Sequence, residues 1–312
     1  MKARLGGLDA LRGLAALCVL GYHLHTVYGG FDLFMRSYLA VDFFFMLSGF
    51  VMARSYEDRL AEGLEAKAFF SARYRRLFPP MCIGAILGYL LLPAEISGSE
   101  ISFLATLLFI PTLGPEPFPA NRPTWSIFFE LFANALHALC LWRFDRKRLL
   151  LIASISVVGV TYLGLSSNGI ALGNKADDFV GGIPRVLLAY AVGIVIFRSL
   201  KPFPLPLWPS YLLLISALLL IPHGLLMDLF FVVAISPILI VFGAQRGGSV
   251  GAIWLGRLSF PLYAVHYPIL QFGERASLSP YLSAMIAILF ASAIATIFDT
   301  WLPKISARRT KN

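Results

Sequence analysis

Arg12 and His23 are ionisable residues within the first apolar segment, where such side chains are rare. The segment reads LDALRGLAALCVLGYHLHTVYG. Their spacing of eleven residues is close to three turns of an α-helix, so both side chains project from one face, ~16 Å apart along the axis. An arginine and a histidine on one stripe of a membrane helix are costly unless the protein uses them. The pair predicts a binding group at one depth and a proton-handling group at another.

Two carboxylates lie inside other apolar segments. Asp42 precedes Ser48 in AVDFFFMLSGF, and it either faces the interior of a bundle or starts a helix, where the helix dipole stabilises a negative charge. Glu130 lies six residues into the apolar segment that opens with TWSIFFELFANALHAL, and Trp125 near its start is an aromatic typical of a membrane interface. Glu130 serves either in catalysis or as the structural partner of an arginine on another helix.

Arg73 and Arg76 precede a further apolar segment in FFSARYRRLFPP. Their i, i+3 spacing puts them on one face of a helix, where two guanidinium groups can bind phosphate, while Arg75 points elsewhere. The alternative is a basic cap that only fixes membrane topology.

A polar stripe follows the segment LGRLSFPLYAVHYPIL, where Ser259 and Tyr263 are i, i+4 neighbours and His266 is i+3 from Tyr263. Such stripes supply either interhelical hydrogen bonds or substrate contacts. In the first segment Asp9 is i, i+3 from Arg12 and can reduce the cost of burying that cation.

The elements that position these residues are membrane helices. Of the 312 residues 58% are hydrophobic, and apolar runs of spanning length recur from end to end, so the chain is predicted to be a single polytopic all-α bundle over residues 1–312. The predicted spans number about ten: 9–28, 38–54, 77–92, 124–142, 149–165, 183–199, 208–222, 225–243, 257–272 and 281–301. The stretch 101–113 is too short to span and is predicted to be re-entrant or interfacial.

Charge supports this topology. With ten spans and both termini in the cytoplasm, 20 of the 26 Lys and Arg residues lie on the cytoplasmic side, as the positive-inside rule requires. The net charge of +9 is then an orientation signal and an attraction to anionic lipid, so no nucleic-acid partner is expected. The three cysteines lie inside apolar segments without paired spacing, which predicts neither a disulfide framework nor a metal site.

Five motifs together resemble the membrane acyltransferase-3 family, the integral-membrane O-acyltransferases of polysaccharides and related acceptors. In the family's order they are LDALRGLAALCVLGYH, AVDFFFMLSGF, RYRRLFPP, TWSIFFE and LGRLSFPLYAVHYP. The family's first-span arginine and histidine match Arg12 and His23, its arginine pair matches Arg73 and Arg76, and its fourth-span acid matches Glu130. The chain departs from the family around that acid, where Ile127, Phe128 and Phe129 make the surroundings more apolar, and we expect no appended soluble esterase domain.

The resemblance implies transfer of an acyl group, usually acetyl, from acyl-coenzyme A to a hydroxyl of a cell-surface or lipid-linked glycan. The arginines at positions 12, 73 and 76 would bind the coenzyme phosphates. His23 would act as general base or as a transient acyl carrier, and Glu130 or Asp42 would orient His23 or help to bind the acceptor. The remaining candidates for substrate contacts are Ser48, Trp125, Tyr263 and His266.

The location implied by the resemblance is a bacterial inner membrane. The competing function is a secondary transporter or flippase of a lipid-linked glycan, which would also place ionisable groups inside its spans. The absence of G-x-S-x-G, H-E-x-x-H and P-loop motifs disfavours a serine-triad hydrolase, a zinc protease and a nucleotide-driven pump.

Overall fold

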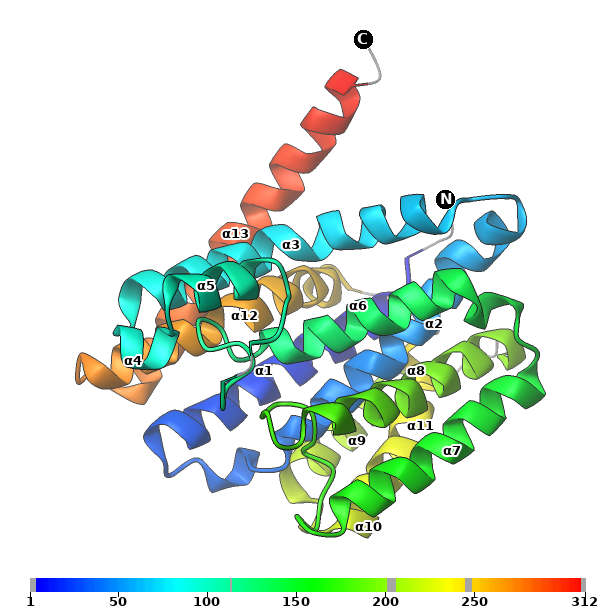
Figure 1. Cartoon of the computed structure of the whole chain (residues 1–312), viewed down its shortest axis with the longest axis horizontal. Helices are drawn as coiled ribbons and strands as arrows, with labels where there is room; N and C mark the ends of the chain where they lie inside the picture. Colours follow the sequence, from blue (N-terminus) through cyan, green and yellow to red (C-terminus); the bar gives the residue numbers. More distant parts are fainter. Residues whose placement is uncertain (1–3, 113, 201–205, 245–248, 310–312) are drawn as a thin grey trace.

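The computed structural model describes residues 4–112, 114–200, 206–244 and 249–309, with side chains up to residue 298. Within these ranges the regular elements are helices, and no strand forms (Figure 1). The α-helices are α1 (Gly6–Tyr28), α2 (Ala40–Ala61), α3 (Ala66–Leu91), α4 (Ala94–Ser97), α5 (Glu100–Leu107), α6 (Thr124–Leu139), α7 (Arg146–Gly164), α8 (Gly182–Ser199), α9 (Trp208–Leu220), α10 (Leu225–Phe230), α11 (Ser236–Gly243), α12 (Val250–Arg275) and α13 (Pro280–Arg309). Each of the ten predicted apolar ranges falls on one or more of these helices.

Six helical segments are long and apolar enough to cross a membrane: Gly6–Tyr28, Asp32–Ala61, Arg146–Gly164, Phe179–Ser199, Leu225–Gly243 and Pro280–Phe298. The other four predicted ranges lie on α3, α6, α9 and α12. Helices α6 and α9 have only 16 and 13 residues, whereas α3 and α12 have 26 residues each and carry arginines. The chain is therefore an all-helical protein with several membrane-spanning helices, built as the hydrophobic runs predict.

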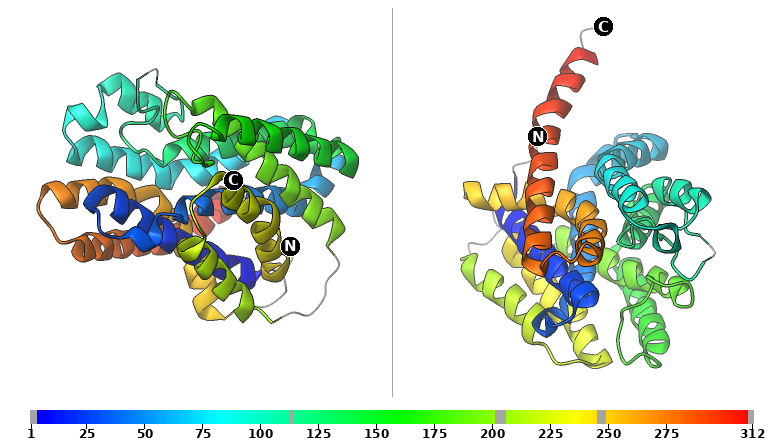
Figure 2. Two further views of the ribbon diagram at one scale, coloured as in Figure 1. Left: turned by 90° about the horizontal axis from the view of Figure 1, so that it is seen from below. Right: turned by 90° about the vertical axis from the view of Figure 1, so that its left-hand side faces the viewer.

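Helices α1 and α12 run side by side in the same direction (Figure 2). Three contacts at successive levels show this: Asp9 lies against Gly256, His23 against His266, and the Tyr28 hydroxyl against Gly273. A Cβ added at Gly256 would lie 2.5 Å from the Cβ of Asp9, so the missing side chain is what allows the two helices to approach. This close contact fixes the register that places the two histidines at one depth.

Helices α2 and α8 make a similar close approach through two glycines. A Cβ at Gly49 would meet the carbonyl oxygen of Tyr190 at 2.1 Å, and one at Gly193 would meet that of Met46 at the same distance. Small residues at such crossings let helix backbones pack directly, which is the usual source of helix association in membranes. The α2–α8 contact holds Asp42 and Ser48, both on α2, in fixed positions relative to the rest of the bundle.

The segment between α3 and α6 folds back along α3. The ring of Phe103 on α5 stacks on Tyr89 at 4.3 Å, and the ring of Phe109 lies 5.5 Å from that of Tyr74. Tyr74 is 17 residues before the end of α3, ~26 Å along the helix axis. The chain then returns, and Asn121 reaches α12. The predicted apolar stretch 101–113 is helical only to Leu107, and its last residue is outside the described ranges.

Prolines inside the helices free backbone carbonyls for other partners. Pro268 has no N–H, so the carbonyl of Ala264, one turn earlier, receives no helical hydrogen bond from it. The side-chain amide of Asn121 donates to that oxygen at 2.9 Å and so ties the returning loop to α12. Before Pro237 the helix widens into a π-helical turn over Phe231–Ile235, a distortion that a proline commonly accompanies.

Candidate active site

A cavity of about 690 Å³ lies among α1, α2, α3, α6, α12 and α13. Its volume falls within the range of ~300–1,000 Å³ of small-molecule and cofactor sites. Six arginines and two carboxylates line it: Arg4, Arg12, Arg73, Arg75, Arg76, Arg257, Asp9 and Glu130. The cavity wall therefore carries a formal excess of positive charge, which suits a polyanionic ligand.

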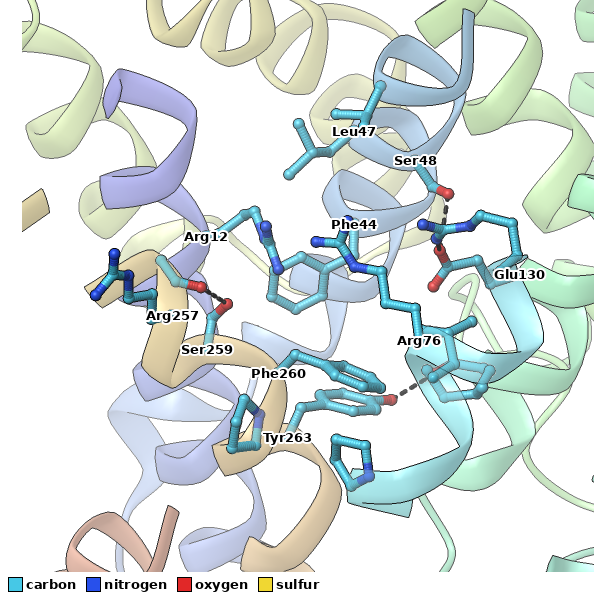
Figure 3. A pocket seen from close by; sticks show the side chains of 18 of the residues that line it. Arg12, Phe44, Leu47, Ser48, Arg76, Glu130, Arg257, Ser259, Phe260 and Tyr263 are labelled. Atoms are coloured by element: carbon cyan, nitrogen blue, oxygen red, sulfur yellow. Dashed lines mark hydrogen bonds and ion pairs between the residues drawn. The ribbon is translucent and has the colours of Figure 1, made fainter. Parts of the chain in front are cut away.

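The cavity has an exposed mouth and a buried inner end. Arg4, Arg75 and Arg257 are exposed, whereas Ser126 and Tyr263 are buried. In Figure 3 Arg12 and Arg76 point toward one another across the cavity, and the rings of Phe260 and Tyr263 lie together on another part of its wall. We call the mouth, lined by the exposed arginines, the arginine end of the bundle.

The three arginines predicted to bind a phosphate-bearing donor, Arg12, Arg73 and Arg76, all line this one cavity. The sequence also predicted that Arg75 points elsewhere, but in the structure Arg75 lines the same cavity. Arg4 and Arg257 were not predicted to bind the donor. The signal that could have indicated them was their position near the starts of α1 and α12, the two helices that pack together.

The arginines differ in how fully the protein neutralises them. Arg73 donates to Oε1 of Glu130 at 2.8 Å and is buried. Arg12 is 4.0 Å from Asp9, which is engaged at 2.5 Å by Arg4. Arg76 makes no hydrogen bond or ion pair with any described residue. A guanidinium without a carboxylate partner is available to a bound phosphate.

Glu130 lies in the cavity wall between two donors. The Ser48 hydroxyl and the Arg73 guanidinium both donate to its Oε1 at 2.8 Å. The sequence offered an arginine partner on another helix as the structural role of Glu130, and Arg73 is such a partner. Ser48, the second donor to Glu130, also lines the cavity. A catalytic role for Glu130 stays a prediction.

Asp42 lies outside the cavity lining in a buried ion pair. Both its oxygens accept from Arg185, at 2.9 and 2.7 Å, and the two side chains are almost fully buried. Arg185 also donates to the Leu172 carbonyl and lies over the ring of Trp125 at 5.3 Å. The contacts within the described residues thus give Asp42 and Trp125 a packing role through Arg185, and none of them joins either residue to His23.

His23 lies beyond the inner end of the cavity, where α12 completes its surroundings. Tyr263, whose hydroxyl is 2.6 Å from that of Ser126, belongs to the cavity wall. One helical turn further on, His266 has its Nε2 2.8 Å from Nδ1 of His23. The sequence selected both histidines for separate roles, and only the pairing of α1 with α12 brings them into contact.

Two aromatic rings flank His23. The Tyr22 ring lies 5.1 Å from the imidazole and the Tyr267 ring 5.0 Å, both edge-on. Arg122 lies over the Tyr267 ring at 5.8 Å. Among the described residues no group of three or more His, Cys, Asp or Glu side chains is arranged to hold a metal ion. The groups around His23 are a second imidazole, two phenols and a guanidinium.

These features define a class: a multi-pass membrane protein with an arginine-lined cavity that leads toward a pair of histidines, one buried and one half-buried. The family model described as an acyltransferase domain matches residues 5–302, nearly the whole chain. The chain therefore belongs to the acyltransferase-3 family of membrane acyltransferases, as its motifs predicted.

Two curated proteins illustrate the relationship. Protein 2 in the picA locus of Rhizobium radiobacter is 35% identical over 174 residues, which cover 48% of this chain and 90% of that protein. Acyltransferase MdmB of Streptomyces mycarofaciens is 27% identical over 319 residues, which cover 87% of this chain and 80% of that protein. No solved structure matches the chain significantly.

Proposed function

We propose that this membrane acyltransferase moves an acyl group, acetyl in the simplest case, from acyl-coenzyme A to a hydroxyl of a cell-surface or lipid-linked glycan. The observation that carries the proposal is the convergence of six arginines on one cavity. Coenzyme A carries a diphosphate and a ribose phosphate, and guanidinium groups bind phosphate oxygens in paired hydrogen bonds.

The same arginines support an orientation in the membrane. We place the arginine end in the cytoplasm, where acyl-coenzyme A is made, with ten membrane crossings and both termini on that side. The positive-inside rule supports this choice. Both named relatives are from bacteria, which supports a bacterial inner membrane as the location.

The coenzyme would bind with its nucleotide at the arginine end and its pantetheine arm along the cavity. Arg12 and His23 are ~16 Å apart along α1, a distance comparable with the reach of that arm. The thioester would then lie near Tyr263, one helical turn from the histidine pair. Glu130 would hold Arg73 in position and limit the net charge of the empty site.

The transfer itself needs a base for the acceptor hydroxyl. His23 takes the hydroxyl proton while the oxygen attacks the thioester carbonyl carbon. The carbon–sulfur bond breaks, and the proton passes to the coenzyme thiolate, which leaves as a thiol. General-base catalysis of this kind contributes ~10²–10⁴-fold. The route through an acyl-histidine uses the same ring as nucleophile and the same leaving thiol.

A glycan acceptor is consistent with the aromatic surroundings of His23. Tyr22 is half-buried and presents a ring on which the apolar face of a sugar can pack, and the exposed Arg122 offers a polar contact. Tyr267 is buried beside His23 and supports Arg122, which lies over its ring. These groups lie toward the end of the bundle opposite the arginine end, so donor and acceptor would approach His23 from different sides.

The test is acyl transfer by purified protein in detergent micelles. Wild type with acetyl-coenzyme A should release free thiol when an acceptor glycan is present, and mass spectrometry should find the acyl group on that glycan. His23→Ala should abolish release while keeping the melting temperature of the wild type. Full activity of that variant would refute the mechanism. Glycan translocation in proteoliposomes without any acyl transfer would favour the transporter or flippase instead.

A further inference from the structure

The two histidines make three short contacts that together determine where their protons lie. Nδ1 of His266 is 2.9 Å from the carbonyl oxygen of Leu262, Nε2 of His266 is 2.8 Å from Nδ1 of His23, and Nδ1 of His23 is 3.2 Å from the carbonyl oxygen of Val19. A neutral imidazole has one N–H donor and one acceptor nitrogen, and a carbonyl oxygen only accepts.

One arrangement of two neutral rings satisfies all three contacts. His266 carries its proton on Nδ1 and donates it to Leu262, which leaves Nε2 as an acceptor. His23 then carries its proton on Nδ1 and donates it to His266 Nε2, with the Val19 oxygen as a second acceptor. The reverse direction would set two lone pairs against carbonyl oxygens, because both Nδ1 atoms would be unprotonated.

The consequence falls on the far nitrogen of His23. With the proton on Nδ1, the Nε2 atom of His23 holds a free lone pair, and it makes no hydrogen bond with the described residues. His23 is half-buried. Some buried polar atoms of the described residues lack a hydrogen-bond partner, and Nε2 of His23 does not belong to that set. It is the nitrogen placed to take a proton or an acyl group.

We infer that His266 is a positioning residue that holds His23 in the Nδ1–H tautomer and so presents Nε2 to the reaction. This inference rests on the proposed function and deepens it, since either route of transfer needs a lone pair on His23 Nε2. It also changes the assignment of His266, which the sequence had suggested as a substrate-binding residue.

The surroundings of His266 suit this role. Its side chain is 1% exposed, and its Nδ1 proton is held by a carbonyl of its own helix, so it has little freedom to change tautomer. The backbone carbonyl sets the tautomer of His266, and His266 sets the tautomer of His23. A hydrogen-bond partner sets the tautomer of a metal-binding histidine in the same way. No carboxylate contacts this pair among the described residues, so the orienting group is a neutral imidazole.

The test compares three substitutions of His266 in the full-length protein. In His266→Gln the amide oxygen can occupy the place of Nε2 and accept from His23. In His266→Asn the shorter amide reaches the Leu262 carbonyl but not His23, and in His266→Ala both contacts are lost. His25→Ala is the matched control, because His25 lies two residues from His23 and faces Asp32 at 3.2 Å instead.

We expect kcat to fall about 10²-fold in the Ala and Asn variants with the KM for acetyl-coenzyme A unchanged, and the Gln variant to stay within about tenfold of wild type. Nitrogen-15 spectra of histidine-labelled protein should show His23 protonated on Nδ1 in wild type and His266→Gln. In His266→Ala the same spectra should show a mixture of tautomers. Melting temperatures identify any variant that fails to fold, and the remaining variants still decide the question.

Equal activity of wild type and His266→Asn, or an unchanged His23 tautomer in His266→Ala, would overturn the inference. Failure of the proposed function has a different signature. If wild type transfers no acyl group but the labelled spectra show that His266 controls the His23 tautomer, then the function is wrong and the pairing stands.

Discussion

Replacing Arg76 with glutamine should weaken acyl-coenzyme A binding without destabilising the bundle. Arg76 points into the cavity and forms no ion pair with any described residue, so the folded protein loses no internal partner. A hydrogen bond to a charged group contributes about 1.5–3 kcal/mol. Since each 1.4 kcal/mol is a factor of about ten, the Kd for the donor should rise about 10- to 150-fold.

Arg73 provides the contrast. Its guanidinium donates to Glu130 inside the bundle, so Arg73→Gln removes an internal partner as well as a cation. We expect that variant to lose both donor affinity and thermal stability, whereas Arg76→Gln should lose affinity alone. The comparison separates a binding arginine from one that also organises the wall of the cavity.

The assay is equilibrium titration of the purified protein with acetyl-coenzyme A at one fixed ionic strength, because salt screens exposed charges. Titration with acetylated pantetheine, which lacks the phosphates of the coenzyme, should show no difference between wild type and Arg76→Gln. Lys67→Gln is the matched control, since it removes one positive charge from α3 at an exposed position outside the cavity. Equal Kd values for acetyl-coenzyme A in wild type and Arg76→Gln would refute phosphate binding by this arginine.

Three further predictions concern stability. Asp42→Asn should destabilise the protein by about 3–5 kcal/mol, because it leaves Arg185 buried without its carboxylate, and thermal melting in detergent measures this; a melting temperature equal to wild type would count against the pair. Gly193→Val should lower the free energy of unfolding by about 1–3 kcal/mol or more, because the added side chain overlaps the Met46 carbonyl. Its melting temperature, compared with that of Gly193→Ala, checks this. Burial raises the pKa of the Glu116 carboxyl above its ordinary value of 4.5, so this group stabilises the folded state below that pH, and the contribution is lost as pH rises through the folded pKa. Glu116→Gln should therefore flatten the fall in melting temperature as the pH rises above 4.5, and identical pH profiles would contradict it.

The hydrophobic pattern was sufficient to place helices over all ten predicted ranges, because membrane-length apolar runs leave the backbone few alternatives. Helix ends were less predictable. Helix α3 begins at Ala66, eleven residues before the predicted span, because a helix continues into water as long as its residues tolerate it. The short segment 101–113 was predicted to be re-entrant or interfacial, and its path along α3 depends on contacts such as that of Phe109 with Tyr74.

The site was predicted in part. Helical spacing alone put Arg73 and Arg76 on one face, since i, i+3 neighbours lie together in any helix. The partner of Asp42 could not be read in this way, because Arg185 is 143 residues away and only the α2–α8 packing brings them together. Helix spacing also did not predict that Arg75 lines the same cavity as Arg73 and Arg76.

Arg12 and His23 illustrate the division between the two kinds of information. Their separation along one helix is a property of sequence, because the rise per residue is fixed. What each residue faces depends on α12, which packs parallel to α1 through Gly256 and places His266 against His23. Sequence determined the membrane class, the helices and the residues able to do chemistry. The tertiary structure decided which of them share a cavity and which histidine nitrogen is free, because both depend on contacts between distant segments.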